Sequence, residues 1–187
     1  MSKEIWKPGN LLYPLPAVLV SVTDGEGNDN VLTVAWTGTI CSDPAMVYIS
    51  VRKERHSYEM IKKTGEFVIN LTTEKLLEAT DHCGVRSGKD EDKFEVCGLH
   101  KETAKYVKAP LIKESPLNLE CEVTEIKELG SHDMFMANVL AVDVSPELLD
   151  EKGTLRLDKA NLIAYSHGRY YSLGEELGTF GYSVRKK

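Results

Sequence analysis

The sequence contains no run of eighteen uncharged apolar residues, and residues 1–8 hold no apolar core. The first absence argues against a membrane-spanning helix, and the second argues against a secretory signal peptide. Acidic residues outnumber basic ones, 29 to 23, so the net charge is −6. This balance argues against a nucleic-acid surface, because positive charge drives binding to a phosphate backbone. We expect a cytoplasmic protein that binds neither nucleic acid nor a membrane.

Cysteine is scarce, with four widely spaced residues: Cys41, Cys83, Cys97 and Cys121. In a chain without an export signal, reduced thiols are the default. Cys83 and Cys97, with His82 and His100, offer four possible zinc ligands. The adjacent pair His82 and Cys83 has an unfavourable spacing, because metal ligands are usually two to four residues apart. We expect no metal site.

Regular βα alternation and internal repeats are also missing. Residues 24–29 hold two glycines, but a third glycine and a following helix are absent, so they predict a hairpin turn and not a dinucleotide-binding loop. Strand patterns follow one another through turns, at residues 17–23, 46–51, 66–70, 117–129, 134–144, 163–165 and 169–171. This order favours a mainly β fold, an antiparallel β-barrel with a few helices. The length of 187 residues fits a single domain over residues 1–187.

The longest strand pattern alternates strictly. Leu117, Leu119, Cys121 and Val123 share one face, and Asn118, Glu120, Glu122 and Thr124 share the other. This pattern predicts a long antiparallel strand with its polar face in solvent.

Positive charge gathers at residues 52–57, RKERHS, immediately before a helical pattern. Ser57 is the expected N-cap of this helix, and Gly65 is its expected stop. Cations beside a helix N-terminus are typical of a phosphate site. The alternative is a solvated basic turn.

A hydroxyl-rich segment precedes these cations. Continuous strand alternation would place Thr33, Ala35 and Thr37 on one face, with Val34 and Trp36 on the other. The small, hydroxylated face suits a flat ligand. The alternative is an ordinary hairpin strand with Trp36 in the core. In the polar loop at residues 85–92 and just after it, Lys89 and Lys93 either approach a ligand phosphate or are solvated. Thr72 and Thr73 are the expected cap of the helix that precedes this loop.

Several segments in order resemble one known family. They are NVLTVAWT at 30–37, DPAMVYISV at 43–51, RHSYEMIKKTGEFVIN at 55–70, SGKD at 87–90, SHDMF at 131–135 and YSLGE at 171–175. The sequence resembles the flavin reductase-like family with the FMN-binding split-barrel fold, most closely its flavoredoxin-type branch. The resemblance implies an antiparallel split β-barrel of Greek-key type, bound FMN, and a homodimer with flavin sites near the interface.

The resemblance also implies roles for individual residues. For the phosphate these are Arg52, Lys53, His56, Ser57 and Lys93. For the flavin ring they are Thr33, Val34, Ala35, Trp36 and Thr37, with Ser50 and Val51 behind them. Asn30, Cys83 and Ser87 lie in the matching segments and are added to the cofactor-binding set. His132 is a candidate for contact with the flavin or nicotinamide, and no side chain is required as an acid or base.

Three functions are compatible with this resemblance. The first is an NAD(P)H-dependent flavin reductase, in which NADH or NADPH donates hydride to flavin N5. The second is an electron carrier that keeps FMN tightly bound and exchanges electrons with a partner protein. The third is a flavin-binding protein without turnover. Fold alone does not decide among them.

Overall fold

The computed structural model describes residues 2–185, so Met1, Lys186 and Lys187 of the expected single domain lie outside the described part. The elements, in chain order, are β1 (Leu15–Pro16), β2 (Val18–Thr23), β3 (Asp29–Val34), β4 (Thr37–Ser42), β5 (Ala45–Val51), α1 (His56–Thr64), β6 (Glu66–Asn70), η1 (Glu74–Leu76), α2 (Leu77–Val85), α3 (Lys93–Val96), β7 (Lys101–Glu102), β8 (Leu111–Ile112), β9 (Leu117–Glu128), β10 (Asp133–Val144), η2 (Pro146–Leu148), η3 (Leu157–Lys159), β11 (Ile163–Ser166), β12 (Arg169–Ser172) and η4 (Tyr182–Val184).

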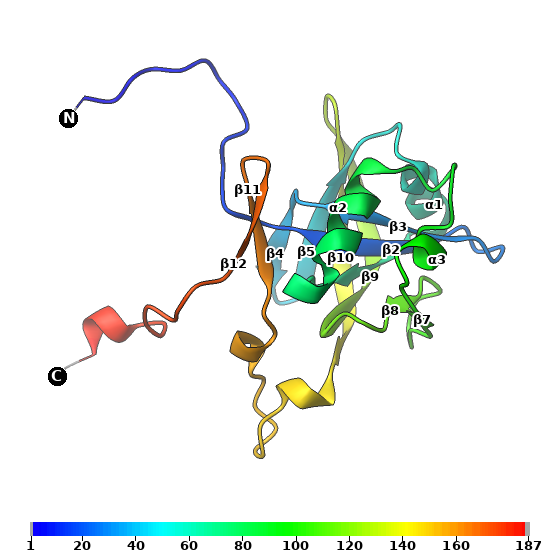
Figure 1. Ribbon diagram of the computed structural model, residues 1–187. Helices are drawn as coiled ribbons and strands as arrows, with labels where there is room; N and C mark the ends of the chain where they lie inside the picture. The colour runs from blue at the N-terminus through cyan, green and yellow to red at the C-terminus, as the bar shows by residue number, and fades with distance from the viewer. Residues whose placement is uncertain (1, 186–187) are drawn as a thin grey trace.

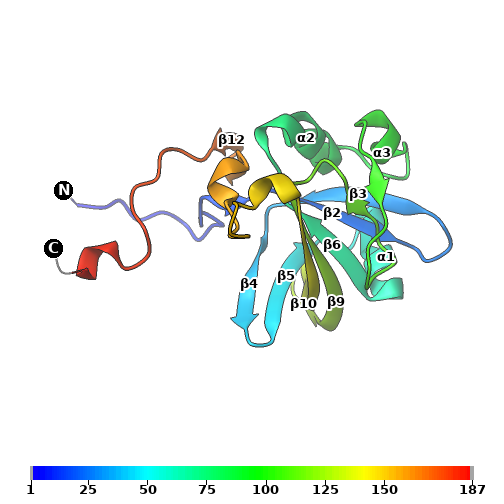
Figure 2. The same cartoon turned by 90° about the horizontal axis from the view of Figure 1, so that it is seen from below.

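A seven-stranded sheet forms the body of the protein, with the order β3-β2-β6-β9-β10-β5-β4. Every pairing in it is antiparallel. The sheet curls around one core, while α2 and α3 lie together on one side of it (Figures 1 and 2). The expected mainly β, antiparallel split barrel is confirmed.

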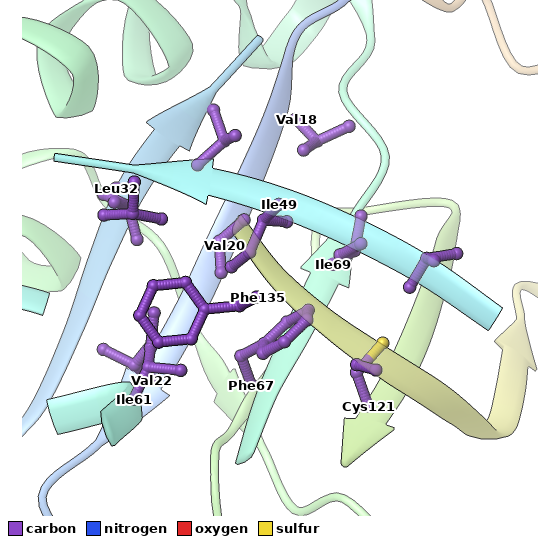
Figure 3. Close-up of a cluster of buried hydrophobic side chains, with 14 of the residues drawn as sticks. Val18, Val20, Val22, Leu32, Ile49, Ile61, Phe67, Ile69, Cys121 and Phe135 are labelled. Carbon is purple, nitrogen blue, oxygen red and sulfur yellow. The ribbon is translucent and has the colours of Figure 1, made fainter. Parts of the chain in front are cut away.

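The barrel core fills from strand positions that point inward. Val18, Val20 and Val22 of β2 meet Phe67 of β6 and Phe135 of β10 in this cluster (Figure 3). The opposite face of β2 is buried as well, because Leu19 packs under α2 and α3. A strand covered on both faces has a nearly continuous apolar sequence, as residues 17–22 do.

The hydroxyl-rich segment is not one strand. β3 ends at Val34, and β4 begins at Thr37 after a bend at Ala35 and Trp36. The prediction that Thr33, Ala35 and Thr37 share a strand face is therefore wrong. Trp36 is half-buried, and its carbonyl accepts a 2.8 Å hydrogen bond from the Ser50 N–H. The bend thus places Trp36 beside β5.

The basic helix begins two residues earlier than predicted. Arg55 is the N-cap of α1, and Ser57 lies inside the helix with a buried hydroxyl that accepts 2.8 Å from Asn30 Nδ2. The prediction of Ser57 as the cap is wrong, because its hydroxyl is held by β3. The stop at Gly65 is confirmed, with the left-handed φ of 70° that favours glycine.

The threonines before the next helix do not cap it by side-chain hydrogen bonds either. Thr73 is the N-cap of η1 but makes no side-chain cap bond, and the Thr72 hydroxyl donates to the carbonyl of Ala17. Thr72 thus ties this turn to the start of β2.

The long hairpin β9–β10 is confirmed, but the polar face of β9 is only partly in solvent. Asn118 and Glu120 are buried, while Glu122 and Thr124 are exposed. The segment at residues 104–115 covers the first two. The Glu120 carboxylate accepts three backbone N–H bonds from it, from Lys105, Tyr106 and Val107, at 2.6 to 3.1 Å.

A small second sheet, ordered β1-β11-β12, stands beside the barrel. The chain before it and the chain after it extend from the same side of the molecule (Figures 1 and 2). Within residues 2–185, no helix has the length and apolar character needed to cross a membrane.

Candidate functional site

A cavity of about 490 Å³ opens between the barrel and the small sheet, and we call it the ring pocket. The bend after β3 and the end of β5 form its barrel wall. The residues predicted for a flavin ring that line this wall are Thr33, Val34, Ala35, Trp36, Ser50 and Val51. Three tyrosines, Tyr13, Tyr165 and Tyr170, line the opposite side.

A second cavity of about 370 Å³ adjoins the ring pocket, and we call it the anion pocket. Arg52, Arg55, Leu32 and Val85 line both cavities, so the two are direct neighbours. Arg86, His56 and Lys93 also line the anion pocket, together with the polar side chains of Asn30, Ser57 and Ser87. Five basic side chains and one carboxylate, that of Glu54, therefore surround this space, and Glu54 pairs with Arg52 at 3.2 Å.

The N-terminus of α1 faces the anion pocket. His56 and Ser57 are its first two residues, and Arg55 precedes it. The first N–H groups of a helix have no partner within the helix and carry partial positive charge, so they favour an anion. Together with the arginine guanidiniums, they fit a phosphate group.

Two glycines, Gly84 and Gly88, pack closely against β3 next to the anion pocket. A Cβ on Gly88 would lie 2.2 Å from Asn30 Oδ1, and one on Gly84 would lie 3.3 Å from Thr33 Cβ. These two glycines allow the end of α2 and the following loop to approach β3. The loop thereby brings Arg86 and Ser87 to the cavity that Arg55 also lines.

Lys93 is not solvated. It is 3% exposed, and its ammonium donates to the carbonyls of Val31 and Cys83, at 2.9 Å each. Burial lowers the pKa of Lys93. Its position next to the anion pocket adds positive charge there, while its hydrogen bonds hold α2, α3 and β3 together.

Three predicted residues do not line either cavity. The Lys53 ammonium lies 3.3 Å from Asp133 and 3.7 Å from Glu128. The Thr37 hydroxyl donates to the Tyr48 carbonyl at 2.6 Å, and the Cys83 thiol faces Cys97. Each of these side chains has a partner inside the fold that the sequence pattern does not reveal.

His132 lies against Trp36 at the edge of the ring pocket. Their ring centroids are 4.4 Å apart, at an interplanar angle of 36°. Burial, together with the charges of Arg52 and Arg55, lowers the pKa of His132. A neutral imidazole is therefore favoured at this wall of the pocket.

Sequence reasoning missed several residues of the site. Arg55 stands in the basic run, yet no pattern assigns it to the ligand, and Arg86 belongs to the polar loop in which only Lys89 and Lys93 are expected near a ligand. The three tyrosines come from both ends of the chain, so no local pattern unites them. Within residues 2–185, no group of three or more His, Cys, Asp or Glu side chains is arranged to hold a metal ion.

Similarity to solved structures first defines the class of protein. Flavoredoxin of Desulfovibrio vulgaris (Miyazaki F) is 28% identical, with a TM-score of 0.91 over 98% of this chain and 100% of that chain. Flavoredoxin from Methanosarcina acetivorans is 25% identical, with a TM-score of 0.89 over 97% of each chain. The class is that of flavin-binding split-barrel oxidoreductases.

The family follows from the sequence comparison. The chain belongs to the flavin reductase like domain family, whose model matches residues 11–174. An uncharacterised protein of Pyrococcus abyssi is 34% identical over 156 residues, which cover 83% of this chain and 87% of that protein. The resemblance derived from the quoted motifs is confirmed.

Proposed function

We propose that the protein binds FMN with its ring in the ring pocket and its phosphate in the anion pocket. The observation that carries this proposal is that the two cavities are neighbours and share Arg52 and Arg55 in their walls. A flat slot beside an excess of basic side chains suits a planar ring joined to a phosphate.

The residues divide between two tasks. Arg52, Arg55, Arg86, His56 and the N–H groups of α1 hold the phosphate, helped by Ser57, Ser87 and Asn30. The backbone and side chains of residues 33–36, with Ser50 and Val51, hold the ring. Lys53, Thr37 and Cys83 do not take part, because none of them lines either cavity.

We propose NAD(P)H-dependent flavin reduction as the activity. When bound, FMN supplies the redox chemistry, and the protein supplies binding and orientation. NADH or NADPH serves as the hydride donor, approaching through the open side of the ring pocket. Trp36 and His132, whose rings lie 4.4 Å apart, form an aromatic wall there against which a nicotinamide ring can pack.

Similarity to two flavoredoxins favours a second candidate, an electron carrier that retains FMN and receives electrons from a partner protein. The two candidates differ in one measurement. FMN-loaded protein is mixed anaerobically with NADH and then NADPH, and the flavin absorbance is followed. Rapid bleaching by either nucleotide supports the reductase. Bound flavin that stays oxidised with both supports the carrier.

Two further parts of the proposal concern the setting of the protein. A cytoplasmic location fits its four free cysteines, because reducing compartments preserve thiols. A homodimer fits the apolar side chains exposed along both terminal segments, which include Trp6 and Phe180.

The placement of the phosphate is tested by titrating protein variants with FMN and with riboflavin, which lacks the phosphate. Arg55→Ala should weaken FMN binding about tenfold or more and leave riboflavin binding unchanged. Lys53→Ala is the matched comparison, because it removes a neighbouring cation that pairs elsewhere, and FMN affinity should be preserved. Equal loss of both ligands in Arg55→Ala would reject the placement.

A further inference from the structure

Two of the four free cysteines lie against each other beside the anion pocket. Sγ of Cys83, in α2, is 3.9 Å from Sγ of Cys97, the residue that follows α3. A disulfide needs a sulfur separation of about 2.05 Å, so the two atoms must approach by about 1.9 Å. The other two thiols have different neighbours: Cys41 lies by the Asp43 carbonyl and Cys121 by the Leu119 carbonyl.

The two cysteines differ in exposure. Cys83 is completely buried among Leu19, Val31 and Phe94. Cys97 is half-buried and lines an open cavity of about 330 Å³. A small oxidant can therefore reach Cys97 from solvent. Cys83 is buried next to Cys97, so it can react only second, as the resolving thiol.

We propose that Cys83 and Cys97 are an oxidative modification site that forms an intramolecular disulfide by exchange with a small disulfide of the glutathione type. The Cys97 thiolate attacks one sulfur of the small disulfide and releases the first small thiol. The Cys83 thiolate then attacks Cys97 Sγ in the mixed disulfide and releases the second. The two protons lost by the cysteines leave on the two small thiols, so atoms and electrons balance.

Burial controls the rate of this exchange. It raises the pKa of the Cys83 thiol to about 12, and it also raises the pKa of Cys97. Thiolate is therefore scarce near neutral pH, and the reaction should accelerate as pH rises. A slow, pH-dependent exchange suits a thiol pair that stays reduced until a disulfide pool accumulates.

The disulfide would close the part of the chain that completes the anion pocket. Arg86, Ser87, Gly88 and Lys93 lie between the two cysteines and line that pocket. Lys93 is also tied to Cys83 directly, through the hydrogen bond to its carbonyl. Fixing both ends of this segment lowers the freedom that ligand binding must remove, so the oxidised protein binds FMN more tightly. This second part rests on the proposed function.

The experiment incubates the 187-residue chain with oxidised glutathione at mildly alkaline pH, blocks the remaining thiols and measures intact and peptide masses. We expect a product lighter by two hydrogen atoms, with a linked Cys83–Cys97 peptide pair. Cys83→Ala should instead stop with one glutathione on Cys97, and Cys41→Ser should behave as the natural chain. Unreacted thiols, a stable glutathione adduct on the natural chain or a different pairing would overturn the modification site.

Two further readouts test the consequence. Oxidation should raise the melting temperature by about 5 °C or more, because a cross-link restricts the unfolded chain. The FMN dissociation constant should fall about fivefold in the oxidised natural chain. Both effects should be absent in Cys97→Ser. Disulfide formation without a change in FMN affinity would overturn the coupling. Failure of the reduced protein to bind FMN would count against the proposed function and leave the mass result unaffected.

Discussion

At the scale of single residues, one unfavourable interaction stands out: two carboxyl groups lie close together near the segment at residues 104–115. Glu120 is fully buried and satisfied by three backbone N–H donors. Asp143 lies beside it on β10, and its Oδ2 is buried without a hydrogen-bond partner among the described residues. Burial, with the neighbouring charge of Glu120, raises the pKa of Asp143. A charged Asp143 therefore costs stability.

We predict that Asp143→Asn stabilises the protein at pH 7. The folded state binds this proton more tightly than the unfolded state, so the carboxyl favours folding at low pH. That contribution is lost as pH rises from the ordinary value of 3.8 through the raised pKa. The amide avoids this loss, and we expect a gain of at most about 1 kcal/mol after allowance for solvent screening.

Urea denaturation between pH 3 and pH 8 measures this effect. The gain should vanish at the acidic end, where both proteins carry an uncharged side chain. Glu122→Gln is the control, because Glu122 lies on the paired strand β9 but is exposed. A gain that persists at pH 3, or a loss at pH 7, would contradict the prediction.

At the scale of elements, a buried carboxylate joins α1 to β10. The Tyr58 hydroxyl donates to Asp133 Oδ2 at 2.7 Å, and Leu129 N–H donates to Asp133 Oδ1 at 3.2 Å. The Lys53 ammonium lies on the same carboxylate. The hydrogen bond from Tyr58 is the largest cause that lowers the pKa of Asp133. The hydrogen bonds from Tyr58 and Leu129 tie α1 to the turn between β9 and β10.

Tyr58→Phe should lower the free energy of unfolding at pH 7 by about 1.5–3 kcal/mol, because it removes a buried hydrogen bond to a charged group. Stabilisation of a carboxylate is present above its unfolded pKa and is lost as pH falls through the lowered folded pKa. The difference between the two proteins should thus shrink below about pH 3.8. Glu128→Gln, which removes only an exposed partner of Lys53, should change little. Urea denaturation of the natural chain and Tyr58→Phe at pH 7 and pH 3 measures this difference, and an equal difference at both pH values would contradict the prediction.

The elements were predictable where one face of a strand or helix decides the pattern. The hairpin β9–β10, the strand at residues 66–70 and the glycine stop of α1 follow from alternation and cap chemistry. The burial of Glu120 and Lys93 did not follow, because each is satisfied by backbone groups distant in sequence. The local sequence pattern predicts the residues of the barrel wall of the ring pocket. Arg86 and the three tyrosines reach the two cavities only through the tertiary fold, so no local pattern predicts them.

The close approach of the loop at residues 86–92 to β3 is a second feature of this scale. A Cβ on Gly88 would overlap the side chain of Asn30, which lies 2.2 Å away at Oδ1. Gly88→Ala should therefore displace Arg86 and Ser87 from the anion pocket. We expect FMN binding to weaken about tenfold, as for the loss of one charged contact.

Fluorescence titration with FMN measures this loss. Gly130→Ala is a matched control, since a Cβ there meets nothing within 4 Å. An affinity for FMN equal to that of the natural chain would show that the loop does not shape the phosphate site. Circular dichroism confirms that both variants keep the barrel.

At the scale of the whole molecule, the barrel buries the apolar side chains of its own strands but leaves those of the two terminal segments exposed. Ile5 is 97% exposed, Leu177 94% and Phe180 fully exposed, on chain segments that leave the same side of the protein (Figures 1 and 2). Such side chains gain nothing from this position in a single chain. The N-terminal segment also carries Asn10 and Tyr13, which line the ring pocket. Contact with a second copy would therefore bury the apolar side chains next to the proposed flavin site.

The natural chain should sediment as a dimer, and Leu177→Glu combined with Phe180→Glu should sediment as a monomer with an unchanged circular dichroism spectrum. The reason is that two charges replace the apolar area that association would remove from water. Val96→Glu alters an exposed apolar residue on α3 instead, and that variant should remain dimeric. If the natural chain sediments as a monomer, or if the double variant stays dimeric, the C-terminal segment does not form the interface.

Because Tyr13 and Asn10 line the ring pocket, loss of the dimer should also weaken the binding of riboflavin and the binding of FMN by the same factor. That pattern separates an interface effect from loss of a phosphate contact such as Arg55.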